Sequence, residues 1–243
     1  RFKGKAIVLL GSRQKGKTCL LSEIFPSDQD ALWLSGDDVD VQNIMENMTA
    51  QRMRTLLGGR KVIIIDEAQR IKDIGLRMKV ITDQMKDVQL VATGSSAFEL
   101  ANRLNEPLTG RKWEYQLYPL SFAEMVAHHG LLTEKRLLAH RLVYGYYPEV
   151  VTSTGNERNV LKMLADSYMY KDVLAMGNIK KSDKLLTLLQ AIAFQVGDQV
   201  SYSELASTVG IDVKTVESYI DVLEKCYIIF RLPSLSRNLR NEL

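Results

Sequence analysis

The sequence has little of what marks secreted or membrane proteins. Its only cysteines, Cys19 and Cys226, lie far apart and without the spacing of a metal site, so we expect no disulfide framework and a reduced, cytoplasmic setting. Apolar runs such as Ala6–Leu10 are far shorter than the about twenty residues of a membrane-spanning helix. Basic and acidic residues nearly balance, 32 against 29, and the net charge of +3 by itself indicates neither a nucleic-acid coat nor a membrane surface.

What is present is the composition of a globular protein. The chain has 243 residues, 46% of them hydrophobic and 25% charged, which suits one large or two ordinary domains and excludes a disordered or collagen-like protein. Chains of this size bury about 70–75% of their unfolded surface, so the core needs no disulfides to support it.

The first half of the chain predicts an α/β fold with a mostly parallel five-stranded sheet, because short apolar runs alternate with amphipathic stretches. Val62–Ile65 has no polar alternation, as expected for a strand covered on both faces. The expected strands are Ala6–Leu10, Ala31–Ser35, Val62–Ile65, Gln89–Thr93 and Trp113–Leu117, and the expected helices lie near Thr18–Ile24, Asp40–Leu57 and Gly75–Met85.

The rest of the chain predicts two further domains. Ser121 and Glu124 form the signature of a helix start, and we expect a helical middle region over residues 125–184, interrupted at Gly145–Pro148 and Ser153–Asn156. This divides the chain into an α/β domain (1–124), the helical region (125–184) and a third domain (185–243).

The third domain has the layout of a winged helix-turn-helix. An amphipathic helix is followed by a short helix, a turn at Gly210-Ile211, a second helix and a β-rich tail. The expected elements are Leu185–Phe194, Ser203–Val209, Asp212–Lys225 and the tail Cys226–Leu232.

One motif predicts a phosphate-binding loop. Gly11–Thr18 fits the pattern G-x-x-x-x-G-K-[ST] in full and lies between an expected strand and an expected helix. The glycines let the backbone amides turn toward phosphate oxygens, and the helix that follows adds the positive end of its dipole. Lys17 is expected to reach the β- and γ-phosphates, and the Thr18 hydroxyl to ligate Mg²⁺. The candidate nucleotide-binding residues here are Gly11, Ser12, Arg13, Gln14, Lys15, Gly16, Lys17, Thr18 and Cys19.

A second motif predicts the hydrolytic half of the site. Asp66 and Glu67 follow the buried strand Val62–Ile65, where a carboxylate is costly unless a cation or hydrogen bonds meet it. Asp66 is the candidate Mg²⁺ holder and Glu67 the candidate base that activates water. An ordinary acidic turn is the alternative, but the pairing with the loop favours a hydrolase with its own base.

Two further positions are candidates. Thr93 ends another expected strand and Ser95 comes just after it, so their hydroxyls could orient the water or contact the γ-phosphate, while helix capping by Ser95 or Ser96 is a compatible alternative. Arg111 is the candidate transition-state cation, against the alternative of a solvated arginine at the start of a strand.

The charge of the third domain argues against DNA binding. Residues 185–243 hold five basic and seven acidic residues, and the second helix carries Asp212, Glu217, Asp221 and Glu224. A packing or protein-contact role is favoured; the residues still available to DNA are Thr215, Ser218 and Tyr219 for bases and Arg231, Arg237 and Arg240 for the backbone.

Two other groups predict no site. We expect His128-His129 to be helix surface, since no third metal ligand has suitable spacing. For the tyrosines a packed core or interface is favoured over base stacking; they are Tyr144, Tyr146, Tyr147, Tyr168 and Tyr170.

The ordered set of motifs resembles the bacterial and archaeal AAA-fold P-loop ATPases that carry a winged helix and then a restriction-endonuclease-like region. The matching segments are Gly11–Thr18, Ile65–Gln69, Thr93–Ser96, Thr109–Arg111, Tyr118–Glu124, Gly145–Val150, Tyr168–Val173 and the block through Pro233. The resemblance implies ATP and Mg²⁺ as cofactors and a place for Arg111 next to the phosphates.

The sequence departs from this family at three points. Ser12 and Lys15 are unusual in the loop and are expected to face outward. Tyr146 stands where the family has a second glycine. The nuclease-like region is not among these 243 residues.

The leading hypothesis is therefore a Mg²⁺-dependent ATPase coupled to a winged helix. The alternatives are a nucleotide-gated protein- or DNA-binding module with little turnover, and a transcription regulator whose loop is a relic. A protein partner and a homo-oligomer both remain open, as does whether Arg111 acts in its own site or a neighbour's.

Overall fold

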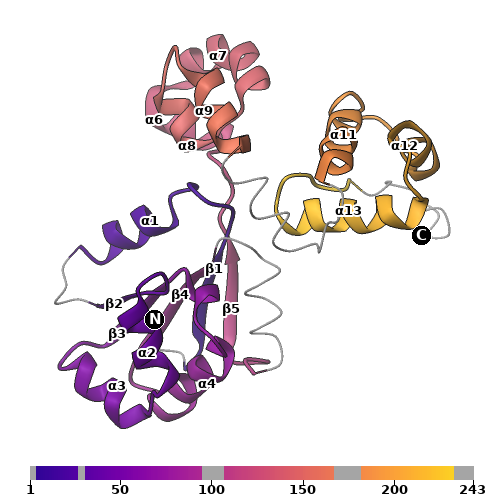
Figure 1. Ribbon diagram of the computed structural model, residues 1–243. Helices are drawn as coiled ribbons and strands as arrows, with labels where there is room; N and C mark the ends of the chain where they lie inside the picture. Colours follow the sequence, from indigo (N-terminus) through magenta and orange to yellow (C-terminus); the bar gives the residue numbers. More distant parts are fainter. Residues whose placement is uncertain (1–3, 27–30, 95–106, 167–181, 233–243) are drawn as a thin grey trace, which may run out of the picture. The chain divides into compact units, whose positions relative to one another are not determined.

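The computed structural model describes residues 4–26, 31–94, 107–166 and 182–232 (Figure 1). The chain divides into two compact units, Arg1–Asp166 and Ser167–Leu243, which are described separately. The finer division at residues 124 and 184 stays a prediction.

The first unit contains the predicted five-stranded sheet. Its strands are β1 (Ala6–Leu10), β2 (Leu32–Ser35), β3 (Val62–Asp66), β4 (Gln89–Gly94) and β5 (Lys112–Gln116), in the order β2-β3-β4-β1-β5. All four strand pairs are parallel, so the α/β prediction is confirmed. Every carboxyl end therefore lies at one edge of the sheet, the usual ligand edge of an open α/β fold.

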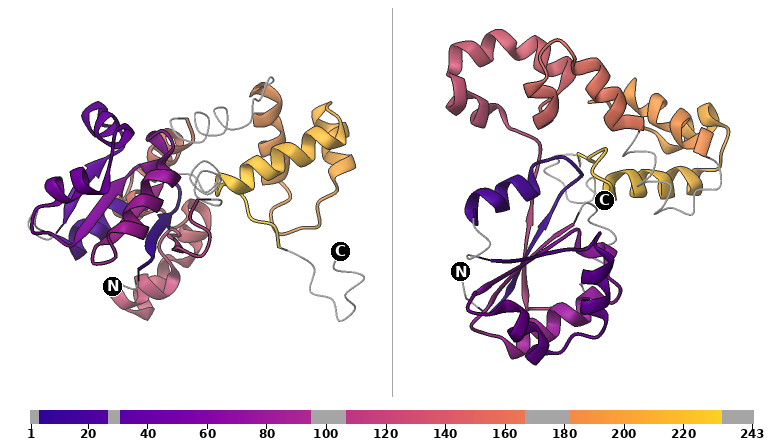
Figure 2. Two further views of the ribbon diagram at one scale, coloured as in Figure 1. Left: turned by 90° about the horizontal axis from the view of Figure 1, so that it is seen from below. Right: turned by 60° about the vertical axis from the view of Figure 1, so that its left-hand side comes forward.

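Helices cover both faces of the sheet. Helix α1 (Lys17–Ile24) lies on one face, and α2 (Val39–Glu46), α3 (Ala50–Leu57) and α4 (Ile74–Gln84) lie on the other (Figures 1 and 2).

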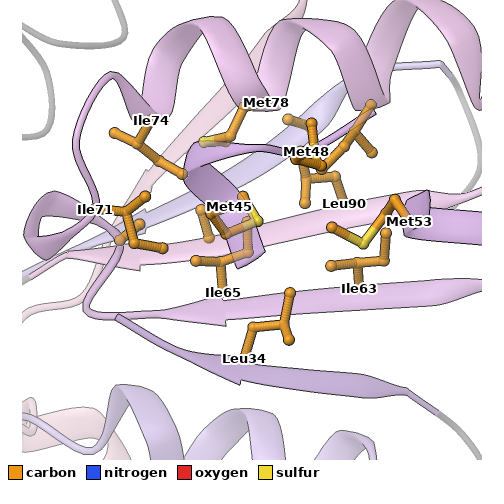
Figure 3. Packing of buried hydrophobic residues seen from close by; sticks show 14 of the residues in the cluster. Leu34, Met45, Met48, Met53, Ile63, Ile65, Ile71, Ile74, Met78 and Leu90 are labelled. Atoms are coloured by element: carbon orange, nitrogen blue, oxygen red, sulfur yellow. The ribbon is translucent and has the colours of Figure 1, made fainter. Parts of the chain in front are cut away.

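Strand β3 is apolar from Val62 to Ile65, as expected for a strand covered on both faces. Ile63 and Ile65 pack with Met45 and Met53 on the three-helix face (Figure 3), whereas Ile64 belongs to the cluster under α1. Flexible methionine side chains fill the space between helices and sheet.

The predicted helix Asp40–Leu57 is wrong as a single element, since α2 ends at Glu46 and α3 begins at Ala50. The Thr49 hydroxyl accepts a hydrogen bond from the Arg52 amide at 3.3 Å and so caps the start of α3. Helix α3 ends at Leu57, and Gly58 follows it at φ 61°, a backbone angle that favours glycine.

Four helices follow β5 in the first unit: α6 (Phe122–His129), α7 (Leu131–Tyr144), α8 (Pro148–Thr152) and α9 (Glu157–Leu164). The predicted capping box is present, with the Ser121 hydroxyl accepting from the Glu124 amide at 3.2 Å. The predicted breaks between α7, α8 and α9 are confirmed, and an unpredicted one occurs at Gly130, where φ is 90°.

The second unit contains α11 (Ser182–Ala193), α12 (Tyr202–Val209) and α13 (Val213–Lys225) around a core that includes Leu188, Leu205 and Val216. Gly210 makes the turn between α12 and α13 in the left-handed conformation, so the helix-turn-helix layout is as predicted.

A wing is not confirmed. Residues 226–232 form no strand, and the Tyr227 and Ile228 amides close the end of α13 by donating to the Glu224 and Leu223 carbonyls. Among the described helices, none has the length and apolar character to cross a membrane.

Candidate functional site

The predicted phosphate-binding loop joins β1 to α1 at the carboxyl edge of the sheet. Gly16 takes the left-handed conformation (φ 87°), and its carbonyl accepts the Leu20 amide at 2.8 Å as α1 begins. Gly11 lies so close to the segment after β5 that a Cβ there would be 2.6 Å from the Leu117 carbonyl oxygen. Both glycines of the motif are thus required by the backbone path.

Lys17 turns back over the loop. Its Nζ donates to the carbonyl oxygens of Gly11 at 2.8 Å and Ser12 at 3.0 Å, and the side chain is buried. The ammonium group is therefore held beside the backbone curve that the motif predicts for phosphate.

Asp66 joins the ends of three elements. Its Oδ2 accepts from the Thr18 hydroxyl of α1 at 3.0 Å, and its Oδ1 accepts from the Thr93 hydroxyl of β4. The Thr93 oxygen in turn accepts the Glu67 amide at 3.1 Å. Thr93 is fully buried and holds the acidic pair in place; a direct contact between Thr93 and the water or phosphate stays a prediction.

These oxygens fit Mg²⁺ held jointly with a nucleotide. Mg²⁺ prefers hard oxygen ligands and is usually bound through one or two carboxylates together with substrate phosphates. Thr18 and Asp66 supply such donors beside the loop. The described residues contain no cluster of three or more His, Cys, Asp or Glu side chains for a metal cage of protein ligands alone.

Glu67 has a constrained backbone. Its φ of 48° lies in the left-handed region, which is unfavourable for a residue with a side chain, and its Oε2 accepts from Gln69 Nε2 at 2.5 Å. The Gly36 amide donates to the Asp66 carbonyl at 2.8 Å, and a Cβ on Gly36 would lie 2.3 Å from the Glu67 carbonyl oxygen.

Gly36 therefore allows the end of β2 to approach the acidic pair, a role that sequence reasoning missed. The available signal was a glycine directly after the expected strand Ala31–Ser35.

Arg111 does not lie beside the phosphate-binding loop of its own chain, which corrects that reading of the resemblance. The Arg111 carbonyl accepts the Ala6 amide at 2.8 Å, and Lys112 pairs with Ala6, so Arg111 lies at the amino edge of the sheet. The loop leaves the other end of β1, roughly 16 Å away for a five-residue strand. Arg111 Nε donates to Asp83 Oδ1 at 2.7 Å. A role in a neighbour's site stays a prediction.

The remaining loop candidates differ in exposure. Ser12 and Arg13 are half-buried, whereas Gln14 and Cys19 are exposed. Lys15 was expected to face outward, but its exposed fraction is 5%; burial and the nearby Lys17 charge lower its pKa to about 8. Ser95 lies outside the described residues.

Sequence reasoning also missed Tyr147. Its hydroxyl forms a hydrogen bond with Ser12 Oγ and donates to the Arg13 carbonyl oxygen at 3.4 Å. The nearest signal was the tyrosine-containing break at Gly145–Pro148. Tyr147 is half-buried and packs against the loop, and Tyr168 and Tyr170 lie outside the described residues.

A buried carboxylate, Glu134, contacts Tyr146, the residue before Tyr147. It accepts from Tyr146 Oη at 2.5 Å and lies 2.7 Å from His129 Nε2, with Arg141 3.5 Å away. Burial acts to raise the pKa of Glu134, but the Tyr146 and His129 hydrogen bonds and the Arg141 charge outweigh it and lower the pKa. His129 is therefore only partly at the helix surface, with 22% of its side chain exposed, while His128 is exposed as expected.

Comparison with known proteins supports the same fold. A Walker-type ATPase of Pyrococcus abyssi is similar in structure, with a TM-score of 0.60 and 15% identity over 91% of this chain and 84% of that one. In sequence, an uncharacterised protein of Haemophilus influenzae is 25% identical over 250 residues, 92% of this chain and 61% of its own length. One of Methanocaldococcus jannaschii is 26% identical over 273 residues, 95% of this chain and 57% of its own length.

The chain thus spans roughly three fifths of the length of these relatives. Residues 135–243 match DUF8612, a domain of unknown function. Residues 3–126, more than half of the chain, match the family AAA_14, described as an AAA domain, so with its loop, acidic strand end and sheet order the chain belongs to this family of AAA-fold P-loop proteins.

Proposed function

We propose that the protein binds ATP with Mg²⁺ and hydrolyses it. One observation carries the proposal: the Thr18 and Thr93 hydroxyls converge on Asp66, directly beside the loop that holds Lys17. The AAA family and the fold shared with a Walker-type ATPase support it.

Each group then has a chemical role. The loop amides and Lys17 bind the phosphates, and Thr18 and Asp66 hold the metal. Mg²⁺, when bound, neutralises charge on the phosphate oxygens. Glu67 takes the proton from the attacking water, and Gln69 and the Glu67 backbone contacts fix where its carboxylate lies.

Calorimetry with the purified chain tests the proposal. Heat of binding is expected on mixing with ATP and Mg²⁺, and phosphate release is expected on incubation. No heat with ATP would end the proposal. Tight binding without phosphate release would favour the alternative of a nucleotide-gated module.

We further propose that Arg111 completes the site of a neighbouring subunit, because it lies at the far edge of its own sheet. Arg111→Ala and Glu67→Gln are each expected to lose most hydrolysis when assayed alone. A mixture of the two is expected to regain activity, since Arg111 of one subunit then serves the intact Glu67 of another. A mixture as inactive as its components would rule out the shared site.

For the second unit we propose a protein contact in preference to DNA. Tyr219, a candidate base reader, is buried in the core with an exposed fraction of 8%. Arg231, a candidate for binding the DNA backbone, already forms ion pairs with Asp221 and Glu224 of α13. Arg237 and Arg240 lie outside the described residues. A duplex DNA titration is expected to show no salt-dependent affinity.

A further inference from the structure

One side chain of the helical segment α6–α9, that of Tyr147, contacts the phosphate-binding loop. Tyr147 precedes α8, and its hydroxyl meets Ser12 Oγ and the Arg13 carbonyl, 135 and 134 residues earlier in the chain. Lys15 Nζ lies 6.0 Å from the centre of the Tyr147 ring. Three of the four variable loop positions thus face one tyrosine.

The backbone around Tyr147 is held from both sides. The Tyr146 hydroxyl donates to the fully buried Glu134, and the Tyr146 carbonyl accepts the Leu120 amide at 3.0 Å, just after β5. On the other side Pro148, the first residue of α8, has a fixed φ. The contacts of Tyr146 and Pro148 therefore fix the backbone position of Tyr147.

One hydrogen-bond arrangement satisfies all three groups. The Ser12 hydroxyl donates to the Tyr147 oxygen, and the Tyr147 hydroxyl donates to the Arg13 carbonyl. Burial raises the pKa of Tyr147, an effect that the Ser12 hydrogen bond only partly opposes, so the phenol keeps its proton at neutral pH.

The Tyr147 contact holds the loop next to Gln14, the residue with the strained backbone. A trans peptide points its C=O and N–H in opposite directions, so a carbonyl of Arg13 held by Tyr147 turns the Gln14 amide away from that tyrosine. Gln14 itself has φ 58°, a left-handed conformation that a residue with a side chain keeps only when its surroundings hold it.

We propose that Tyr147 is a positioning residue for nucleotide binding: its hydroxyl holds Ser12 and Arg13 so that the loop keeps the curve that binds the phosphates. The inference rests on the proposed ATP binding. Because coupling between the Tyr147 contact and nucleotide binding is reciprocal, phosphates that stabilise the loop also stabilise the Tyr147 contact. Nucleotide binding then changes the stability of the contact between the loop and the helical segment.

The test compares ATP affinity in Tyr147→Phe, Ser12→Ala and the double variant. Tyr147→Phe keeps the ring beside Lys15 and removes only the hydroxyl. Each single variant is expected to raise the Kd for Mg–ATP about tenfold, the effect of one or two lost hydrogen bonds. The double variant is expected to lose about the same tenfold and not the product, since both changes break one linked arrangement.

Two further readouts separate positioning from folding. The KM for ATP is expected to rise about tenfold with kcat at saturating ATP unchanged, and the midpoint of thermal unfolding is expected to fall by only a few degrees, the effect of one or two lost hydrogen bonds on a chain of this size. Tyr144→Phe is the matched control, because Tyr144 packs on His140 (ring centres 4.7 Å apart) and the change is the same loss of a phenol oxygen. Its ATP affinity is expected to equal that of the wild type.

The outcomes are distinguishable from those for the proposed function. A wild-type chain that binds no ATP overturns both ideas. Wild-type binding with unchanged affinity in Tyr147→Phe and Ser12→Ala overturns the positioning role alone, as does a double variant whose loss is the product of the single losses.

Discussion

Glu67→Gln is expected to lower kcat for ATP hydrolysis by about 100-fold or more while leaving the Kd for ATP within about threefold of wild type. Glutamine has nearly the same shape as glutamate but cannot take a proton from water. The hydrogen bond from the Glu67 backbone amide to the Thr93 hydroxyl does not involve the Glu67 side chain, so the backbone position should be the same in the variant.

The measurement is phosphate release under single-turnover conditions, with affinity determined separately by calorimetry. Glu23→Gln is the matched control, since it removes one exposed carboxylate from α1 of the same unit. That variant should hydrolyse ATP at the wild-type rate. If Glu67→Gln kept a rate within threefold of wild type, Glu67 would not be the base.

The sequence predicted the sheet well because its signals are local. Val62–Ile65 is uniformly apolar and β3 is covered on both faces, so pattern and structure agree. The phosphate-binding loop was also predictable, because its glycines and Lys17 lie within eight consecutive residues.

Long-range contacts were not predictable from such patterns. That Asp66 and Thr93 both end strands was evident, but their hydrogen bond depends on β3 and β4 being neighbours in the sheet. The contact between Ser12 and Tyr147 joins residues 135 apart, and no spacing rule links them.

Arg111 shows how a resemblance can conflict with topology. The strand expected at Trp113–Leu117 begins just after Arg111, and residues that precede a parallel strand lie at its amino end. The loop follows its own strand and so lies at the carboxyl end. The predicted sheet therefore already separated Arg111 from the phosphates of the same chain, and the exposed ion pair with Asp83 agrees with the alternative of a solvated arginine at the start of a strand.

Lys17→Met is expected to raise the Kd for Mg–ATP by about 100-fold or more. A charged hydrogen bond contributes about 1.5–3 kcal/mol, and the ammonium is expected to meet oxygens of two phosphates. Methionine keeps most of the buried stem and removes the ammonium group, with its charge and its N–H donors. Part of the free energy gained on binding ATP is offset by the loss of the hydrogen bonds that Lys17 Nζ makes to the Gly11 and Ser12 carbonyl oxygens in the free protein.

Those two carbonyls also lose a donor in the variant, so thermal unfolding must be measured beside affinity. Lys5→Met is the matched control: Lys5 precedes β1 at the opposite edge, its Nζ 4.4 Å from the Trp113 ring centre, and the charge change is the same. It should leave ATP affinity at the wild-type value. A folded Lys17→Met protein that binds ATP as tightly as wild type would show that the loop does not grip phosphates. The expected pair of results is that Lys17→Met loses ATP binding and Glu67→Gln keeps it. That pair would assign ATP binding to the loop and hydrolysis to the acidic pair.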